Sequence, residues 1–203
     1  MAPSWLENFI VRSDSPSTPD TRRGTETPVL KLKYTSLAEH RRILTVDGEK
    51  TPLYELKRQS ILGAWGSKIH VTSPLNSDQE VALIDYHMFS ATIDFPLRDG
   101  HRIKISTSKQ KVAVSGGLGE LHWKGTGMEV AGAASWELRD ETSLVMVAQV
   151  DHAQANGWVM LWKEGLDSQT VEELVVVGVA QIEGYKRMIR QSKTSAVGVM
   201  ANK

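Results

Sequence analysis

An aspartate and a histidine stand two residues apart at Asp85 and His87, at the end of an apolar run. Residues two apart in an extended strand point to the same face, so the Asp85 carboxylate could orient the His87 imidazole as a general base. The more common arrangement of such a pair is a hydrogen bond between surface residues and a loop. Two further pairs fit a turn and a strand end: Asp99 with His101, and Asp151 with His152. Asp85 and His87 are therefore the candidate catalytic residues, should the chain be an enzyme.

Basic side chains gather on neighbouring predicted strands, at Arg98, Arg102, Lys104, Lys109 and Lys111. Arg102 and Lys104 are two residues apart and so share one strand face. If these strands pair, the five cations could meet an anionic phosphate, as a lipid headgroup site requires. The alternative is a solvated strand face whose charges discourage aggregation. These five residues are the candidate ligand-binding residues.

Composition excludes several function classes. The 203 residues include 24 Lys and Arg against 24 Asp and Glu, and this zero net charge argues against a general nucleic-acid binder. The lack of cysteine excludes disulfides, thiol nucleophiles and thiolate metal sites. The sequence has no G-x-S-x-G, H-E-x-x-H or G-x-x-x-x-G-K-[ST] motif. We therefore expect neither a metal nor another cofactor.

The elements that must position these residues are mostly short strands. Alternation of apolar and polar residues begins at 29–34, and Asp47-Gly48 favours a hairpin between 43–46 and 53–56. The remaining runs follow in order: 68–72, 81–87, 91–95, 102–107, 111–114, 119–124, 135–138, 144–150 and 158–162. Their regular spacing, with turn residues between them, is typical of a barrel or a sandwich.

Residues 170–191 break this pattern and predict one long helix. Thr170 and Glu173 fit a capping box, and the apolar run Val175–Val177 leaves a buried strand as the alternative. Cations stand in the last turns, where they face the negative end of the helix dipole: Lys186, Arg187 and Arg190. The first half of the helix is apolar on every side, and such a helix needs protein on every side. Together the elements predict a mostly-β fold, a closed barrel of roughly twelve strands around a hydrophobic C-terminal helix.

Residues outside the barrel divide into two tails. We expect a flexible N-terminal segment over 1–28, because Ser13–Pro28 is rich in Ser, Thr, Pro and charge and has no bulky apolar residue. Four apolar residues near the start could form a docking segment or a loosely ordered terminus: Trp5, Leu6, Phe9 and Ile10. The barrel domain is expected over 29–193, with a flexible tail over 194–203.

No segment predicts membrane insertion or secretion. The longest apolar run, Leu174–Ala180, is far shorter than the ~20 residues that a spanning helix needs. The N-terminus lacks the positively charged start of a signal peptide. We expect a cytoplasmic protein that is not transmembrane, with peripheral association at a membrane surface as an option.

Six segments carry a resemblance to a known family: Leu53–Leu56, Val81–Asp85, Gly119–Lys124, Trp136, Trp158–Trp162 and Leu174–Ile182. In the order of these segments and in their pattern of apolar and polar residues, the chain resembles the Tubby C-terminal-like superfamily over about residues 29–193. The resemblance is in particular to fungal members without an assigned activity. This superfamily includes the Tubby domain, phospholipid scramblases and plant LURP-one-related proteins. The resemblance implies a barrel of about twelve strands wrapped around a hydrophobic helix. The Cys-rich palmitoylated segment and terminal membrane helix of scramblases have no counterpart in this sequence, so scramblase activity is not expected.

Three functions follow as hypotheses. The first is a non-catalytic Tubby-like barrel that binds an anionic lipid headgroup or a protein partner through its basic residues. The second is an enzyme without a cofactor, such as an isomerase or cyclase, or a carrier, acting on a small apolar ligand at the barrel mouth. Tryptophans could line such a pocket or simply pack against the helix: Trp123, Trp136, Trp158 and Trp162. The third is an assembly module that uses the N-terminal segment.

Overall fold

The computed structural model describes residues 18–200 apart from 39, 62–63, 88–89, 107–109 and 129–131. The predicted candidate Lys109 and the apolar residues between 5 and 10 lie outside the described residues. The strands are β1 (Leu30–Ser36), β2 (Arg41–Val46), β3 (Pro52–Ile61), β4 (Ala64–Ser73), β5 (Gln79–Tyr86), β6 (Ser90–Phe95), β7 (His101–Ser106), β8 (Lys111–Ala113), β9 (Glu120–Met128), β10 (Ala134–Arg139), β11 (Leu144–Val150) and β12 (Asn156–Leu161). The helices are α2 (Arg22–Thr25), the 3-10 helix η1 (Pro74–Asn76) and α3 (Ser168–Met200).

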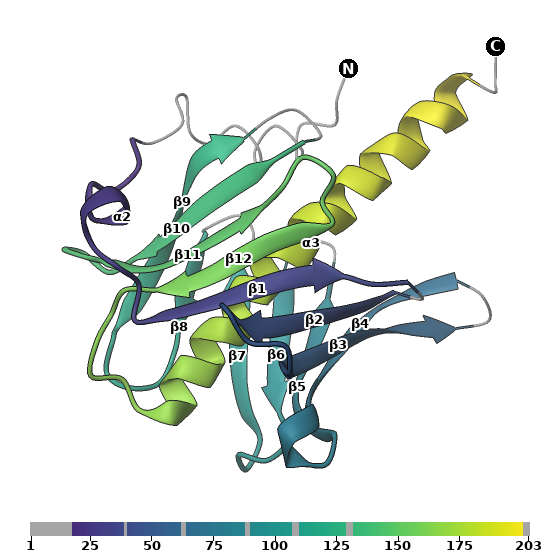
Figure 1. Ribbon diagram of the computed structural model, residues 1–203. Coiled ribbons are helices and arrows are strands. Elements are labelled where there is room, and N and C mark those ends of the chain that lie inside the picture. The colour runs from purple at the N-terminus through teal and green to yellow at the C-terminus, as the bar shows by residue number, and fades with distance from the viewer. Residues whose placement is uncertain are drawn as a thin grey trace.

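The twelve strands form one closed antiparallel barrel, which confirms the predicted fold class (Figure 1). Each strand pairs with the next along the chain, and the ring closes where β1 pairs with β12, with Leu30 opposite Leu161. Closure leaves no unpaired sheet edge, which is the usual weak point of an antiparallel sheet. Every strand therefore has a defined inner face and a defined outer face.

Helix α3 runs through the barrel, as its apolar sequence requires (Figure 1). Its residues Leu174, Val177 and Ile182 are fully buried. Contacts from five strands reach it: Tyr34 of β1 at Glu183, Tyr86 of β5 at Ala180, Trp136 of β10 at Tyr185, and Met146 of β11 and Val159 of β12 at Gly178. The helix thus fills the space that a barrel of this strand number encloses.

The helix begins differently from the prediction. Its first residue is Ser168, and Asp167 provides the cap, because its two carboxylate oxygens accept from the backbone N and the Oγ1 of Thr170, both at 2.8 Å. Thr170 therefore does not form the expected capping box, and Glu173 is released for other contacts. At its other end α3 continues past the predicted residue 191 to Met200. Among the described residues, no helix is both long and apolar enough to cross a membrane.

The tryptophans lie on both faces of the barrel wall. Trp123 and Trp136 are buried in the core around α3. Trp158 and Trp162 belong to a second apolar cluster with Leu144, Val147 and Met160. The inner pair packs against protein, which is the simpler of the two roles considered for these residues.

Gly157 in β12 is predicted to be irreplaceable. A Cβ atom at this position would lie 2.2 Å from the carbonyl oxygen of Gln149 in β11, and a paired backbone cannot move away without breaking the ladder. We expect Gly157→Ala to lower the free energy of unfolding by about 1–3 kcal/mol or more. The measurement is denaturant-induced unfolding followed by tryptophan fluorescence.

The matched control is Gly127→Ala in β9, where an added Cβ meets nothing within 4 Å. This substitution should change stability by no more than about 0.5 kcal/mol. Equal unfolding midpoints for the two variants would contradict the close approach of β11 and β12.

Candidate functional site

Buried charges are attached to α3 at two places, and the first lies near its start. The fully buried Glu173 accepts at Oε1 from Arg98 Nη1 at 2.6 Å and at Oε2 from the Ser115 backbone N at 2.7 Å. Arg98 also pairs with Glu172, and His101 Nε2 lies 3.1 Å from Glu173 Oε1. Each carboxylate here has a cation or an N–H donor, so this group of residues stabilises the helix start.

The second place lies further along α3, in the direction in which the helix leaves the barrel (Figure 1). Its contacts are made to Glu183. The Glu183 side chain is 0% exposed, and its Oε1 accepts from Arg42 Nε at 2.9 Å and from the Tyr34 hydroxyl. Lys186 Nζ lies 3.8 Å from the same oxygen and donates to Tyr34 Oη at 2.9 Å and to Ser36 Oγ at 2.8 Å. Strands β1 and β2 thus supply the groups that bind the helix charge.

Positive charge exceeds negative charge in this cluster. Arg58 and Arg190 also act electrostatically on Glu183, which makes four cations with Arg42 and Lys186. Among the described residues that make up the cluster, Glu183 is the one carboxylate. We call the five residues Arg42, Arg58, Glu183, Lys186 and Arg190 the cationic cluster.

Arg58 is the least satisfied member of the cationic cluster. Arg58 is 6% exposed, and its buried Nε has no hydrogen-bond partner among the described residues. The Oε2 atom of Glu183 is also buried and also lacks a hydrogen-bond partner among these residues. Buried polar atoms in native proteins almost always have partners, so these two atoms mark positions where a bound group would make contacts.

The pKa directions agree with an excess of buried cations. Burial lowers the pKa of Arg58, and repulsion from Arg190 lowers it further. Burial also lowers the pKa of Lys186 to about 8. Burial opposes ionisation of Glu183, but the charges of Arg42 and Lys186 outweigh it and hold its pKa below the ordinary value. Glu183 therefore stays ionised and shares its charge among Arg42, Arg58 and Lys186, and a buried cation without a fully matched partner is costly in a protein interior.

Burial raises the pKa of Tyr34 and of Tyr86, which line the same end of the barrel, and the Glu183 charge raises both further. Both phenols therefore remain protonated and act as donors. Tyr86 donates to the Ala180 backbone oxygen at 2.8 Å, and Tyr34 donates to Glu183. Neither adds a negative charge that could balance the cationic cluster.

The described residues of the predicted basic strip lie on the outside of the barrel or against the helix. Arg102 of β7 pairs with Asp94 of β6, and Lys111 Nζ of β8 lies 2.5 Å from Glu120 Oε1 of β9. Lys104 is exposed on β7, whereas Arg98 is bound to the helix start as described above. Arg102 and Lys111 therefore already contact carboxylates of neighbouring strands, and Arg98 contacts Glu172 and Glu173 of α3.

The predicted catalytic pair, Asp85 and His87, makes separate contacts. Asp85 Oδ1 accepts from Ser67 Oγ at 2.9 Å, and its Oδ2 lies 3.9 Å from Lys68 Nζ. His87 is exposed after the end of β5, where its backbone N donates to the Ser90 oxygen at 2.8 Å. The Asp85 side chain thus contacts Ser67 and Lys68 of the neighbouring strand β4, and His87 is exposed.

Sequence reasoning missed Arg42 and Arg58, although a signal for them exists. Arg42 stands two residues before Leu44, and Arg58 stands two residues after Leu56, so strand alternation places both arginines on the inner face. Lys186 is predicted at the end of the helix, where it faces the dipole and belongs to a second group of basic residues with Arg187, Arg190 and Lys193. An arginine in phase with core leucines on two neighbouring strands indicates a buried charge that needs a partner.

Comparisons with known proteins give no family for this chain. The sequence matches no family model and no curated protein. A crystal structure of a protein from Arabidopsis thaliana is similar with a TM-score of 0.44 and 8% identity, over 85% of this chain and 99% of that chain.

Two substitutions in the cationic cluster are predicted to act in opposite directions. Glu183→Gln removes the carboxylate that Arg42 and Lys186 contact, and we expect it to lower the free energy of unfolding by about 3–5 kcal/mol. Arg58→Met removes an under-compensated buried charge at similar volume, and should leave stability unchanged or raise it. Denaturant unfolding of ligand-free protein measures both.

The control is Glu55→Gln, which breaks an exposed ion pair with Arg41 and should cost less than about 1 kcal/mol. If Arg58→Met lowers the free energy of unfolding as much as Glu183→Gln does, the charge of Arg58 is fully compensated in the folded protein. That result would contradict the excess of positive charge in the cationic cluster.

Stability is predicted to rise with pH above about pH 8. Native Lys186 has a pKa of about 8 and an unfolded lysine 10.5, so between these values the unfolded chain binds more protons and folding is favoured as pH rises. The gain in the free energy of unfolding from pH 8 to 10 should be about 2 kcal/mol.

Above that range Tyr34 lowers the free energy of unfolding as pH rises, because its phenol ionises at lower pH in the unfolded chain than in the folded protein. Lys186→Met should remove the rise, and the exposed Lys68→Met should keep it; identical pH profiles for both variants would contradict the assignment.

Proposed function

We propose that this chain is a non-catalytic binding module of the Tubby-like type, and that its cationic cluster binds a phosphate-bearing anion at the end of the barrel. The observation that carries the proposal is Arg58, a buried arginine with an unpartnered Nε beside three other cations and a single described carboxylate. A bound anion would supply the missing charge and the missing acceptor together.

The chemistry of the cluster favours a phosphate group over a simple counter-ion. Guanidinium groups bind phosphate oxygens through parallel N–H donors, and Arg42, Arg58 and Arg190 bring three such groups to one place. Glu183 Oε2 lacks a donor, and a hydroxyl of the ligand could provide one. A phosphorylated polyol has both groups, and it can come from a lipid headgroup or from a soluble metabolite.

The packing inside the barrel favours a binding site at its end, because the helix fills the middle. Helix α3 occupies the middle with residues such as Leu174, Val176 and Val177, which are buried against the strands. The buried polar atoms without partners at this end belong to Arg58 and Glu183, near the point where the helix leaves the ring. A ligand would therefore approach along the barrel axis.

The test uses the full chain with two probes. Inositol hexakisphosphate, measured by titration calorimetry, represents the soluble source, and sedimentation with phosphatidylcholine vesicles, with and without a phosphoinositide, represents the lipid source. We expect Arg58→Gln to weaken binding of the active probe by at least about tenfold, the loss of one charged hydrogen bond. Thermal unfolding checks that the variant is folded.

The matched control is Arg102→Gln on the outer strip, which should bind as the wild type does. If Arg102→Gln loses binding and Arg58→Gln keeps it, the outer basic strip is the site and the cationic cluster is not. Failure of both probes with wild-type protein would overturn the proposal. Vesicle binding without soluble binding would assign the lipid source, and the reverse result the soluble one.

A further inference from the structure

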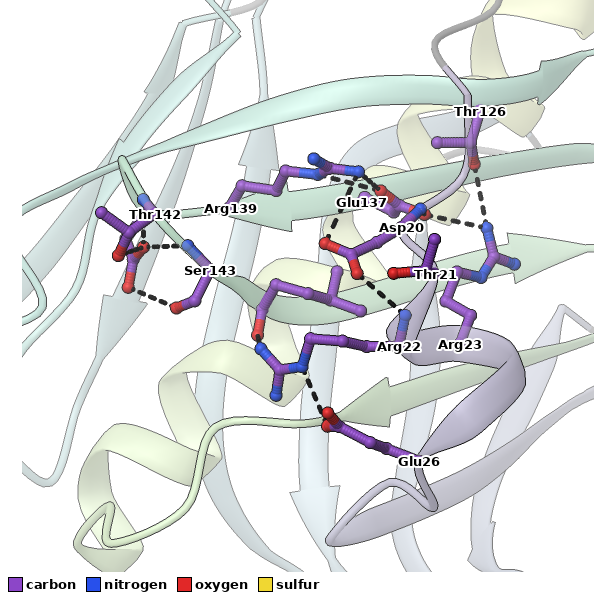
Figure 2. Close-up of polar contacts among 12 residues, drawn as sticks. Asp20, Thr21, Arg22, Arg23, Glu26, Thr126, Glu137, Arg139, Thr142 and Ser143 are labelled. Carbon is purple, nitrogen blue, oxygen red and sulfur yellow. Dashed lines mark hydrogen bonds and ion pairs between the residues drawn. The ribbon is translucent and has the colours of Figure 1, made fainter.

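Residues 20–26 lie on the outside of the barrel, against β9, β10 and β11 (Figure 2). They include helix α2 and belong to the segment expected from composition to be flexible. Their contacts are polar: the Asp20 backbone N donates to Glu137 Oε1 at 3.0 Å, and Arg22 Nη1 lies 3.4 Å from the Leu144 backbone oxygen. Arg23, the next residue along the chain, makes four further hydrogen bonds to the strands.

Arg23 inserts its guanidinium among four side-chain acceptors. Its Nη1 donates to Glu137 Oε1 at 3.2 Å and to Thr126 Oγ1 at 3.1 Å. Its Nη2 donates to Ser135 Oγ at 3.2 Å and to Gln149 Oε1 at 3.4 Å. We call these four acceptor residues, from three neighbouring strands, the arginine slot.

The arginine slot is built into the barrel wall. With residues 20–26 in place, Glu137 is 0% exposed although it lies on the outer face of β10, where a strand residue normally meets water. Its second oxygen, Oε2, accepts from Arg139 Nε at 2.9 Å, so the carboxylate is fixed in place before Arg23 arrives. Paired strands hold the other acceptors, and such preorganisation lowers the cost of binding.

The contacts extend to Asp20, three residues before Arg23 and outside helix α2. Asp20 and Arg23 are three residues apart, and the Asp20 carboxylate lies 3.8 Å from Arg139. The slot and the adjacent Arg139 together therefore contact an arginine and an acidic residue with the spacing Asp-x-x-Arg. Asp20 and Arg23 thus present two opposite charges to Arg139 and Glu137.

We infer that the arginine slot is a binding site for arginine-bearing peptide segments of the form Asp-x-x-Arg, and that Arg23 is its intramolecular occupant. A tethered occupant has an effective concentration in the millimolar range, so it excludes a free segment of equal intrinsic affinity. A partner segment binds when Arg23 is displaced. This site is on the outer wall and is separate from the cationic cluster, so it is independent of the proposed anion binding.

The test empties the slot in the full chain with Arg23→Ala. The probe is a fluorescein-labelled peptide of residues 18–28, TPDTRRGTETP, and the measurement is fluorescence anisotropy. We expect the peptide to bind Arg23→Ala at least about tenfold more tightly than wild type. The same peptide with Lys in place of Arg23 should bind more weakly, because an ammonium lacks the planar fork of donors.

Two controls separate this result from non-specific attraction. Arg22→Ala removes the neighbouring arginine and should leave the slot closed to the peptide. The double variant Arg23→Ala with Glu137→Gln should lose the gain in binding. Equal binding to Arg22→Ala and Arg23→Ala, no binding to Arg23→Ala, or unchanged binding to the double variant would each overturn the inference. If Arg23→Ala does not fold, Arg23→Lys is the second host, and it should bind the wild-type peptide more tightly than wild-type protein does.

Discussion

The structure depends on one constraint: the first half of helix α3 is apolar on every side and must be enclosed by protein. A flat sheet could cover only one side of it, whereas twelve antiparallel strands close into a ring that covers all of them. Ring closure in turn fixes which side chains face inward. Arg42 and Arg58 alternate in phase with core leucines, so the enclosure of an apolar helix also carries charges into the interior.

The two buried glutamates of α3 differ in how fully the charges around them are matched. Around Glu173, Arg98 and a backbone N–H match the carboxylate, so the helix start is held in a closed set of bonds. Around Glu183, cations outnumber carboxylates among the described residues, and Arg58 is left with an unpartnered Nε. Both glutamates stabilise the fold, but only the contacts of Glu173 form a balanced set. Glu183 organises positive charge that the fold itself leaves unbalanced, and natural proteins accept such losses of stability chiefly at sites with a function.

The sequence was informative wherever local pattern decides the outcome. Strand alternation and the all-round apolar helix predicted the twelve strands and the single helix, because both patterns reflect burial directly. The cationic cluster was missed because the usual rule sends Lys and Arg to the surface, and only tertiary closure brings Arg42, Arg58 and Lys186 together. Arg98 was placed in an outer basic strip, yet the turn after β6 directs it to the helix start. Composition alone does not predict that residues 20–26 contact the barrel, because hydrogen bonds and ion pairs, not buried apolar area, hold this segment against the strands.

The pairing of β1 with β12 has a consequence for how the chain reaches this structure. Leu30 finds its partner only when Leu161 is available, and the helix that fills the ring follows still later in the sequence. The last steps of folding must therefore join the most distant strands around an incoming helix, a high-contact-order event that is intrinsically slow. Until then the early strands expose their inner faces and β1 has a free edge, so a partly synthesised chain is the state most in need of protection from aggregation.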